Sequence, residues 1–248
     1  MDNELYTIDL DENGKLCISE KNFNLIKLCV SLDSAYRNTN EKVEKSAAWY
    51  IKNEFYVNGE FVFSKNVVKE VCKRIDREES THLSVSGTKK GNGNGIDKMA
   101  ERILDIGKDK FTELIKQGSD YLVEILSRPI GSVRKNSFAS KFCVNVSKNA
   151  LNKYNYVKFD SVICEVLPYY AKKYIGEIHY NKTKSLIKDE FCDKNHFNYN
   201  DYRLLIERVI EGVKKKQSDC EFLNNDTFDM MLWYYYKGDL NKGDYYGV

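Results

Sequence analysis

Apolar residues recur every three or four positions over most of the chain, a spacing typical of helices with one buried face. Gly107 and Gly118 interrupt one long run and divide it into three short helical segments. Pro168 stands inside a later helical pattern and is expected to kink or end it. The spacing predicts helices at about 23–36, 41–54, 64–75, in three segments from 97 to 126, from 161 onward, and at 202–216 and 226–236.

Two stretches alternate apolar and polar residues instead, which is typical of strands. Residues 5–19 alternate around Asn13-Gly14, and residues 55–63 alternate around Asn58-Gly59. Asn-Gly is the preferred centre of a two-residue hairpin turn, because both positions take positive φ. Two small β-hairpins near the N-terminus are therefore expected.

These elements predict a mainly α protein, a multi-helix bundle with two small β-hairpins. The 248 residues, 42% of them hydrophobic, are enough to bury one sizeable core. Only two prolines occur, and no Pro-rich linker separates modules. We therefore expect one globular unit over 1–248, with a hairpin-and-helix portion at 1–63 and a helical portion at 64–248.

Several classes of protein are disfavoured by composition. The acidic start resembles no secretory signal, and no run of about eighteen apolar residues predicts a membrane span. The seven cysteines have no paired spacing, which favours reduced thiols in a cytoplasmic protein. Cys192 and His196 could form one pair of zinc ligands, but no second pair at zinc-ligand spacing accompanies them. No metal site and no cofactor are therefore predicted.

Charge is distributed unevenly along the chain. Residues 1–20 carry six acids and one lysine, whereas residues 131–191 carry eleven Lys and Arg against five acids. Such a basic region suits contact with a phosphate backbone, so DNA is the expected partner. An ordinary lysine-rich solvated surface is the alternative.

Candidate chemistry centres on Ser137–Asp160. Small residues at Ser137 and Ala139 are expected to form a turn before Lys141, and Asp160 stands where the next helix begins. A turn of this kind brings backbone amides to an anion, and a lysine with a depressed pKa can act as a nucleophile. The plain alternatives are a surface lysine and a helix N-cap.

This stretch resembles the helix-hairpin-helix DNA glycosylases, most closely the 8-oxoguanine DNA glycosylases. The family carries G-x-G-x-K and, about nineteen residues later, V-P-V-D; here SFASK is followed by YVKFD. The resemblance covers about residues 130–170. Ser137 and Ala139 replace the two glycines and Lys158 replaces the proline, which weakens the expected phosphate contact at the hairpin.

The resemblance implies a base-excision glycosylase and lyase acting on a damaged or modified base that is flipped out of DNA. Lys141 matches the Schiff-base lysine and Asp160 the catalytic aspartate. The implied DNA contacts are Arg134, Lys135, Ser137, Ala139 and Ser140.

Two other hypotheses remain open. One is a catalytically inactive module on the same fold that binds nucleic acid or serves host defence, and the other is a helical protein unrelated to nucleic acid. The glycine-rich segment 84–97, with Lys89 and Lys90, is either a second phosphate-binding loop or a surface loop.

Overall fold

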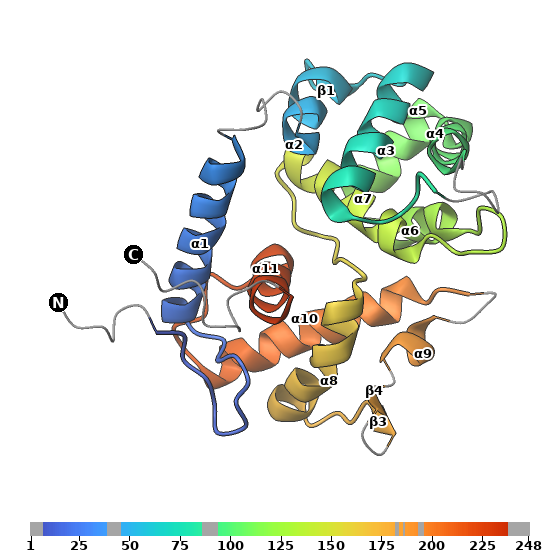
Figure 1. Cartoon of the computed structure of the whole chain (residues 1–248). Coiled ribbons are helices and arrows are strands. Elements are labelled where there is room, and N and C mark those ends of the chain that lie inside the picture. Colours follow the sequence, from blue (N-terminus) through green and yellow to red (C-terminus); the bar gives the residue numbers. More distant parts are fainter. Residues whose placement is uncertain are drawn as a thin grey trace. The chain divides into compact units, whose positions relative to one another are not determined.

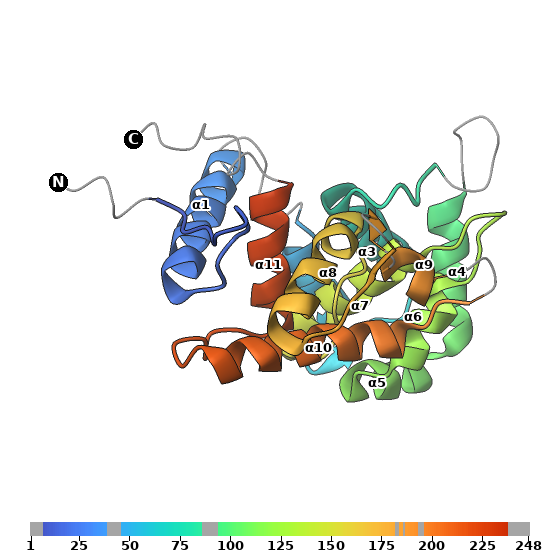
Figure 2. The ribbon, with the colours of Figure 1, turned by 90° about the horizontal axis from the view of Figure 1, so that it is seen from below.

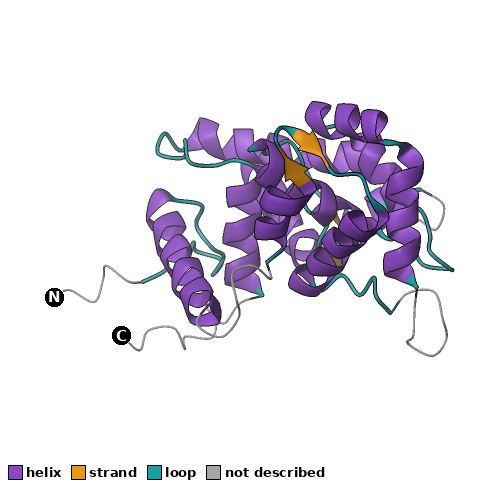
Figure 3. Ribbon diagram, turned by 90° about the horizontal axis from the view of Figure 1, so that it is seen from above, coloured by secondary structure: helices purple, strands orange, loops and turns teal. Residues whose placement is uncertain are grey.

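The structure is a computed structural model, and it describes residues 7–38, 46–85, 94–181, 184–185, 187–192 and 196–237. The described chain is mainly helical, as predicted (Figures 1 and 3). The helices are α1 (Glu20–Asn38), α2 (Ala47–Tyr50), the π-helical turn η3 (Ile51–Phe55), α3 (Lys65–Glu79), α4 (Gly95–Ile106), α5 (Lys108–Gln117), α6 (Asp120–Ser127), α7 (Asn136–Leu151), α8 (Ser161–Ile175), α9 (Ile187–Phe191), α10 (Tyr199–Lys216) and α11 (Asn225–Tyr236).

Strands are few and short among the described residues. The predicted hairpin at Asn58-Gly59 is confirmed, with β1 (Tyr56–Val57) antiparallel to β2 (Glu60–Phe61). The predicted hairpin at 5–19 is reduced in its described part to one bridge between Leu10 and Leu16. A further pair, β3 (Tyr180–Asn181) with β4 (Lys184–Ser185), was not predicted from the sequence.

The chain separates into two compact units. Unit 1 comprises residues 1–40, 160–190 and 204–248, and unit 2 comprises residues 41–159 and 191–203. These boundaries differ from the expected portions 1–63 and 64–248. Each unit is built from segments that are distant in the sequence, because the chain leaves unit 2 after Phe159 and re-enters it at Phe191.

Helix α7 is the central element of unit 2. It packs against α3, α5 and α6, as Figure 1 shows. An apolar core of aromatic rings surrounds it, and Phe111 and Phe142 lie 6.2 Å apart, ring centre to ring centre. Nine residues of α7, from Phe138 to Ser147, are buried; they are Phe138, Ala139, Ser140, Lys141, Phe142, Cys143, Val144, Val146 and Ser147. A helix buried on most sides holds the residues on it in fixed positions.

In unit 1, α11 packs against α1 and α8 (Figure 2). The N-terminal turn is fastened to α8 by polar contacts, since Asp11 accepts hydrogen bonds from Tyr169 and Lys173. Tyr170 donates to the carbonyl of Leu16 over 2.9 Å. These contacts connect two segments more than 150 residues apart.

Of the two expected effects of Pro168, a kink or a helix end, the second does not occur, because α8 continues to Ile175. Proline removes one backbone hydrogen bond, at a cost of about 3 kcal/mol in a helix interior. Leu167, Tyr170 and Ala171 around it are fully buried, and their packing offsets that loss. Among the described residues, no helix is long and apolar enough to cross a membrane.

Candidate functional site

A short hairpin joins α6 to α7 in unit 2. The amide of Ile130 donates to the carbonyl of Val133 over 3.1 Å, and Gly131 adopts a left-handed φ of 68°. Gly131, Ser132 and Val133 are exposed. Within the described part of the chain, nothing accepts a hydrogen bond from the amides of Gly131 and Ser132. The tip therefore presents two backbone donors to solvent.

The turn expected at Ser137 to Lys141 was wrong, because these residues lie within α7. The hairpin occurs about six positions earlier, where Gly131 takes the positive φ that a turn requires. Phe138 and Phe142 stack on consecutive turns of α7, with ring centres 5.9 Å apart. Their burial in the core favours helix at these positions over a turn.

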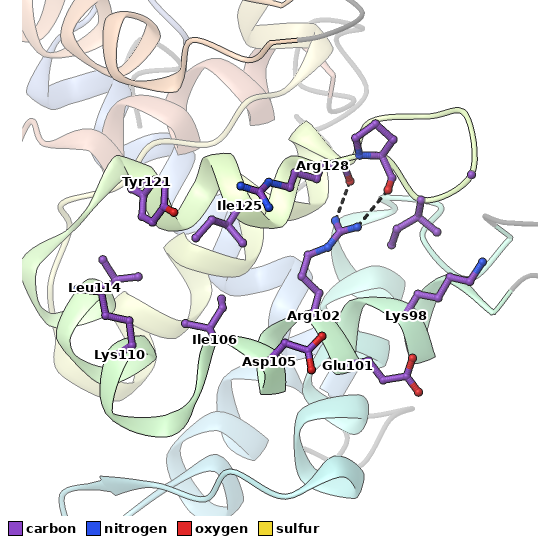
Figure 4. A pocket seen from close by; sticks show the side chains of 13 residues that line it. Lys98, Glu101, Arg102, Asp105, Ile106, Lys110, Leu114, Tyr121, Ile125 and Arg128 are labelled. Atoms are coloured by element: carbon purple, nitrogen blue, oxygen red, sulfur yellow. Dashed lines mark hydrogen bonds between the residues drawn. The ribbon is translucent and has the colours of Figure 1, made fainter.

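Arg102 of α4 fixes the start of the hairpin. Its Nη1 donates to the carbonyls of Leu126 and Arg128 over 3.1 and 2.7 Å, and its Nη2 donates to Pro129 O over 3.0 Å (Figure 4). Burial, helped by the positive charge of Arg128, lowers the pKa of the Arg102 guanidinium. Three charged hydrogen bonds from one side chain hold the end of α6 and the hairpin in place.

A pocket of about 770 Å³ lies between α4, α5, α6 and the hairpin (Figure 4). Tyr121 and Ile125 stand towards one end of it, and Arg102 and Glu101 towards the other. Acidic and basic groups thus share one end. The lining residues are Lys98, Glu101, Arg102, Asp105, Ile106, Lys110, Leu114, Tyr121, Ile125, Arg128, Pro129, Ile130 and Gly131. Because acidic and basic side chains both line the pocket, its electrostatic potential does not by itself favour the binding of an anion.

Arg134 and Lys135, the predicted phosphate contacts, stand between the hairpin and α7. Arg134 Nη2 donates to Ser127 Oγ over 3.0 Å, and the amide of Lys135 donates to the carbonyl of Ser127 over 2.8 Å. Lys135 is only 8% exposed. Burial lowers the pKa of its amine, and the negative charge of Asp76 opposes part of that change.

Lys141, the predicted nucleophile, is 3% exposed in the interior of unit 2. Its Nζ donates to the carbonyl oxygen of Glu79, the last residue of α3, over 3.2 Å. The same Nζ lies 4.0 Å from Glu79 Oε2. Lys141 therefore acts as a C-terminal cap for α3, which is a favourable position for a cation.

The Glu79 carboxylate is shared among several groups. Lys158 Nζ lies 3.0 Å from Glu79 Oε1, and Asn145 Nδ2 donates to the same oxygen over 2.9 Å. Burial raises the pKa of Glu79, but the charge of Lys158, the hydrogen bond from Asn145 and the charge of Lys141 outweigh it and hold the pKa below its usual value. The network keeps a negative charge beside the Lys141 amine.

The three small residues predicted as DNA contacts, Ser137, Ala139 and Ser140, all lie on α7. Ala139 and Ser140 are fully buried. Ser140 Oγ donates to the carbonyl of Ser137 over 3.1 Å and accepts from the amide of Phe159 over 2.9 Å. Ser140 thereby fastens the segment before Asp160 to α7, a contact within the protein.

Asp160, the predicted catalytic aspartate, falls in unit 1, whereas Lys141 falls in unit 2. It is the N-cap of α8 and its Oδ1 accepts from the amide of Val162 over 2.9 Å. Aspartate is a preferred N-cap because its carboxylate satisfies free amides of the first turn. The predicted N-cap position is confirmed, and its catalytic role stays a prediction.

Three residues that shape this site were missed from the sequence: Asp76, Glu79 and Arg102. Asp76 accepts from Thr81 Oγ1 over 2.5 Å and from the amide of Leu83 over 2.6 Å. Glu79 and Arg102 act on residues 24 or more positions away. Charged residues on amphipathic helices carry no local signal of such distant partners, so only the fold reveals them.

No known family model, curated protein or solved structure matches this chain.

Proposed function

We propose that this chain binds DNA through the hairpin between α6 and α7 and acts there as a base-excision glycosylase and lyase. The observation that carries the proposal is the hairpin itself, a left-handed Gly131 between two helices, with Gly131 and Ser132 exposed and no acceptor for their amides among the described residues. Such successive amides form a small anion-binding concavity suited to a phosphate. Arg102 holds the residues that lead into this hairpin, Arg128 and Pro129, by hydrogen bonds to their carbonyls.

The chemistry requires an amine close to this phosphate contact. Two buried lysines follow the hairpin in the sequence: Lys135, the N-cap residue of α7, and Lys141, within α7. An amine attacks C1′ of the deoxyribose as the base departs, and positive charge develops on the sugar. The resulting Schiff base permits strand cleavage by elimination.

A binding module without catalysis is the second candidate, and one observation favours it. Lys141 is held by Glu79 as a helix cap, which is a structural use of the lysine that the resemblance assigns to catalysis. Under this hypothesis, the hairpin still contacts the phosphate backbone while no covalent intermediate forms.

Borohydride trapping separates the two candidates. The chain is incubated with duplexes that carry an abasic site or one of several oxidised, deaminated or alkylated bases, and borohydride is added to reduce any imine. A glycosylase and lyase gives a covalent protein–DNA adduct. If no duplex gives an adduct but DNA binding is salt-dependent, the result supports the binding module without catalysis.

Binding at the hairpin has its own test. Gly131→Val places a β-branched residue at positive φ, which costs about 1–2 kcal/mol, so the affinity for a DNA duplex is expected to fall about tenfold. Gly176→Val is the matched control, because Gly176 has φ of 75° and its added Cβ meets no atom within 4 Å. Fluorescence anisotropy over a salt series measures both. Equal DNA affinities for the two variants would show that the hairpin is not part of the DNA-binding interface.

A further inference from the structure

His179 lies between two carboxylates in unit 1, in the segment that follows α8. Its Nδ1 is 2.7 Å from Glu190 Oε2, and its Nε2 is 3.3 Å from Glu177 Oε2. The residue is only 7% exposed. Within the described residues, these two acids are its charged partners. The arrangement therefore depends on the protonation state of one buried ring.

The two contacts together require one form of histidine. A carboxylate only accepts hydrogen bonds, and a neutral imidazole carries one N–H and one lone pair. In either neutral tautomer, one ring nitrogen of His179 would turn its lone pair towards a carboxylate oxygen. Only the imidazolium cation donates from both nitrogens, and its positive charge strengthens both hydrogen bonds. The geometry thus selects the protonated ring.

Glu177 is fixed from a second side, by Arg208 of α10. Arg208 Nη1 donates to Glu177 Oε1 over 2.5 Å, and Nη2 donates to Oε2 over 3.2 Å. Two hydrogen bonds from one guanidinium orient a carboxylate, and an arginine stays charged in proteins. The position of Glu177 therefore does not depend on the proton of His179.

Glu190 has no such second support. It lies on α9, and within the described residues its carboxylate pairs with His179 alone. Helix α9 has five residues, too few to be stable in isolation. Buried Ile187 and Phe191 anchor its apolar side, and the His179–Glu190 contact anchors its polar side. A neutral ring can satisfy one acid only and repels the other, so loss of the proton weakens the polar anchor.

Other charged groups near the cluster do not replace this cation. In the described part of the chain, the charged side chains that flank the cluster on α8, α9 and α10 make no pair with His179; they are Lys172, Lys173, Lys188, Asp189, Glu207 and Glu211. Arg208 acts on His179 only through Glu177. The ring itself therefore supplies the positive charge in contact with Glu190.

We propose that protonated His179 is a pH-sensitive clamp that holds α9 to the adjoining part of unit 1. The chain passes from unit 1 to unit 2 between Glu190 and Phe191, so the clamp secures the segment that leads to this crossing. Histidine changes its charge between about pH 5 and pH 8. Because the clamped state binds the proton, the clamp is present on the acid side of this range and is lost as the pH rises.

Hydrogen exchange of the full-length chain, followed by mass spectrometry, tests the clamp at about pH 5.5 and about pH 8. After correction for the intrinsic effect of pH, the peptide that contains α9 should exchange about tenfold faster at the higher pH. His179→Gln should remove this difference, because glutamine gains no proton. Lys188→Gln is the matched control, since it removes an exposed charge from α9 without touching the clamp, and it should keep the wild-type difference.

Glu190→Gln provides a second variant in case His179→Gln does not fold. The Glu190 side chain is 41% exposed, so its replacement is tolerated, and loss of its charge should also remove the pH dependence of α9. Equal corrected exchange of the wild-type peptide at both pH values would overturn the proposal. A wild-type difference retained by either clamp variant would do the same. The measurement uses no DNA, so its outcome is independent of the proposed base excision.

Discussion

Two lysines six positions apart near the start of α7 show opposite environments. Lys141 lies at the centre of a charged network that joins α7 to the end of α3, and its amine has a carbonyl and a carboxylate as partners. Lys135 lies at the junction of hairpin and helix, fixed through its backbone, with an amine whose pKa is lowered by burial. The two environments therefore differ: Lys141 caps a helix end beside a carboxylate, and burial lowers the pKa of the Lys135 amine.

The comparison teaches that two buried lysines close together in the sequence can have different electrostatic surroundings. Lys141 is more buried than Lys135, at 3% against 8% exposure. The Lys141 amine contacts the carbonyl and the carboxylate of Glu79, whereas burial lowers the pKa of the Lys135 amine and the charge of Asp76 opposes part of that change. Three expected outcomes test that distinction, from the largest effect to the smallest.

Glu79→Ala is expected to destabilise the protein most. The substitution removes the carboxylate that faces Lys141 and Lys158, and the buried Lys141 amine then lacks this negative charge. The free energy of unfolding is expected to fall by about 3–5 kcal/mol. Urea unfolding followed by circular dichroism measures the loss. Glu113→Ala is the control, because Glu113 pairs with Lys110 on the surface and its removal should leave the midpoint unchanged. Equal midpoints for both variants would mean that the network around Lys141 contributes no stability.

Replacing each lysine by methionine compares the two environments directly. Lys141→Met leaves Glu79 with Lys158 and Asn145, so we expect a loss of about 2 kcal/mol, below the cost of removing a sole partner. Lys135→Met replaces a desolvated amine by an apolar group of similar length and should cost less than about 1 kcal/mol. The free energies of unfolding from urea titrations at pH 7 give both values. If Lys135→Met lowers the free energy of unfolding more than Lys141→Met, the stabilising ion pair would be at Lys135.

The smallest effect is expected in the alkaline pH dependence. The pKa of Lys135 is lower in the folded protein than its ordinary value near 10.5, so between the two values the unfolded chain binds more protons. The unfolding free energy contributed by Lys135 therefore rises with pH across that window, by less than about 1.4 kcal/mol per pH unit. Subtracting the Lys135→Met curve from the wild-type curve between pH 7.5 and 10 isolates this rise, and a flat difference contradicts a lowered pKa.

Much of the secondary structure could be predicted because its causes are local. The breaks at Gly107 and Gly118 and the turn at Asn58-Gly59 each depend on residues within one turn of the chain. The hairpin before α7 was placed about six residues too late, since Ser137 and Ala139 looked like a turn in isolation. Their helical conformation follows from the burial of Phe138 and Phe142 in a core built by distant segments.

The sequence by itself determined the mainly helical class, most helix positions and the lysines and aspartates available near residue 141. Helical periodicity and turn preferences act over three or four residues, so they can be read along the chain. Only the tertiary structure decided that Lys141 caps the end of α3, because Glu79 and Lys141 are 62 positions apart. A pKa depends on the burial and the neighbours of a group, and both arise when helices pack.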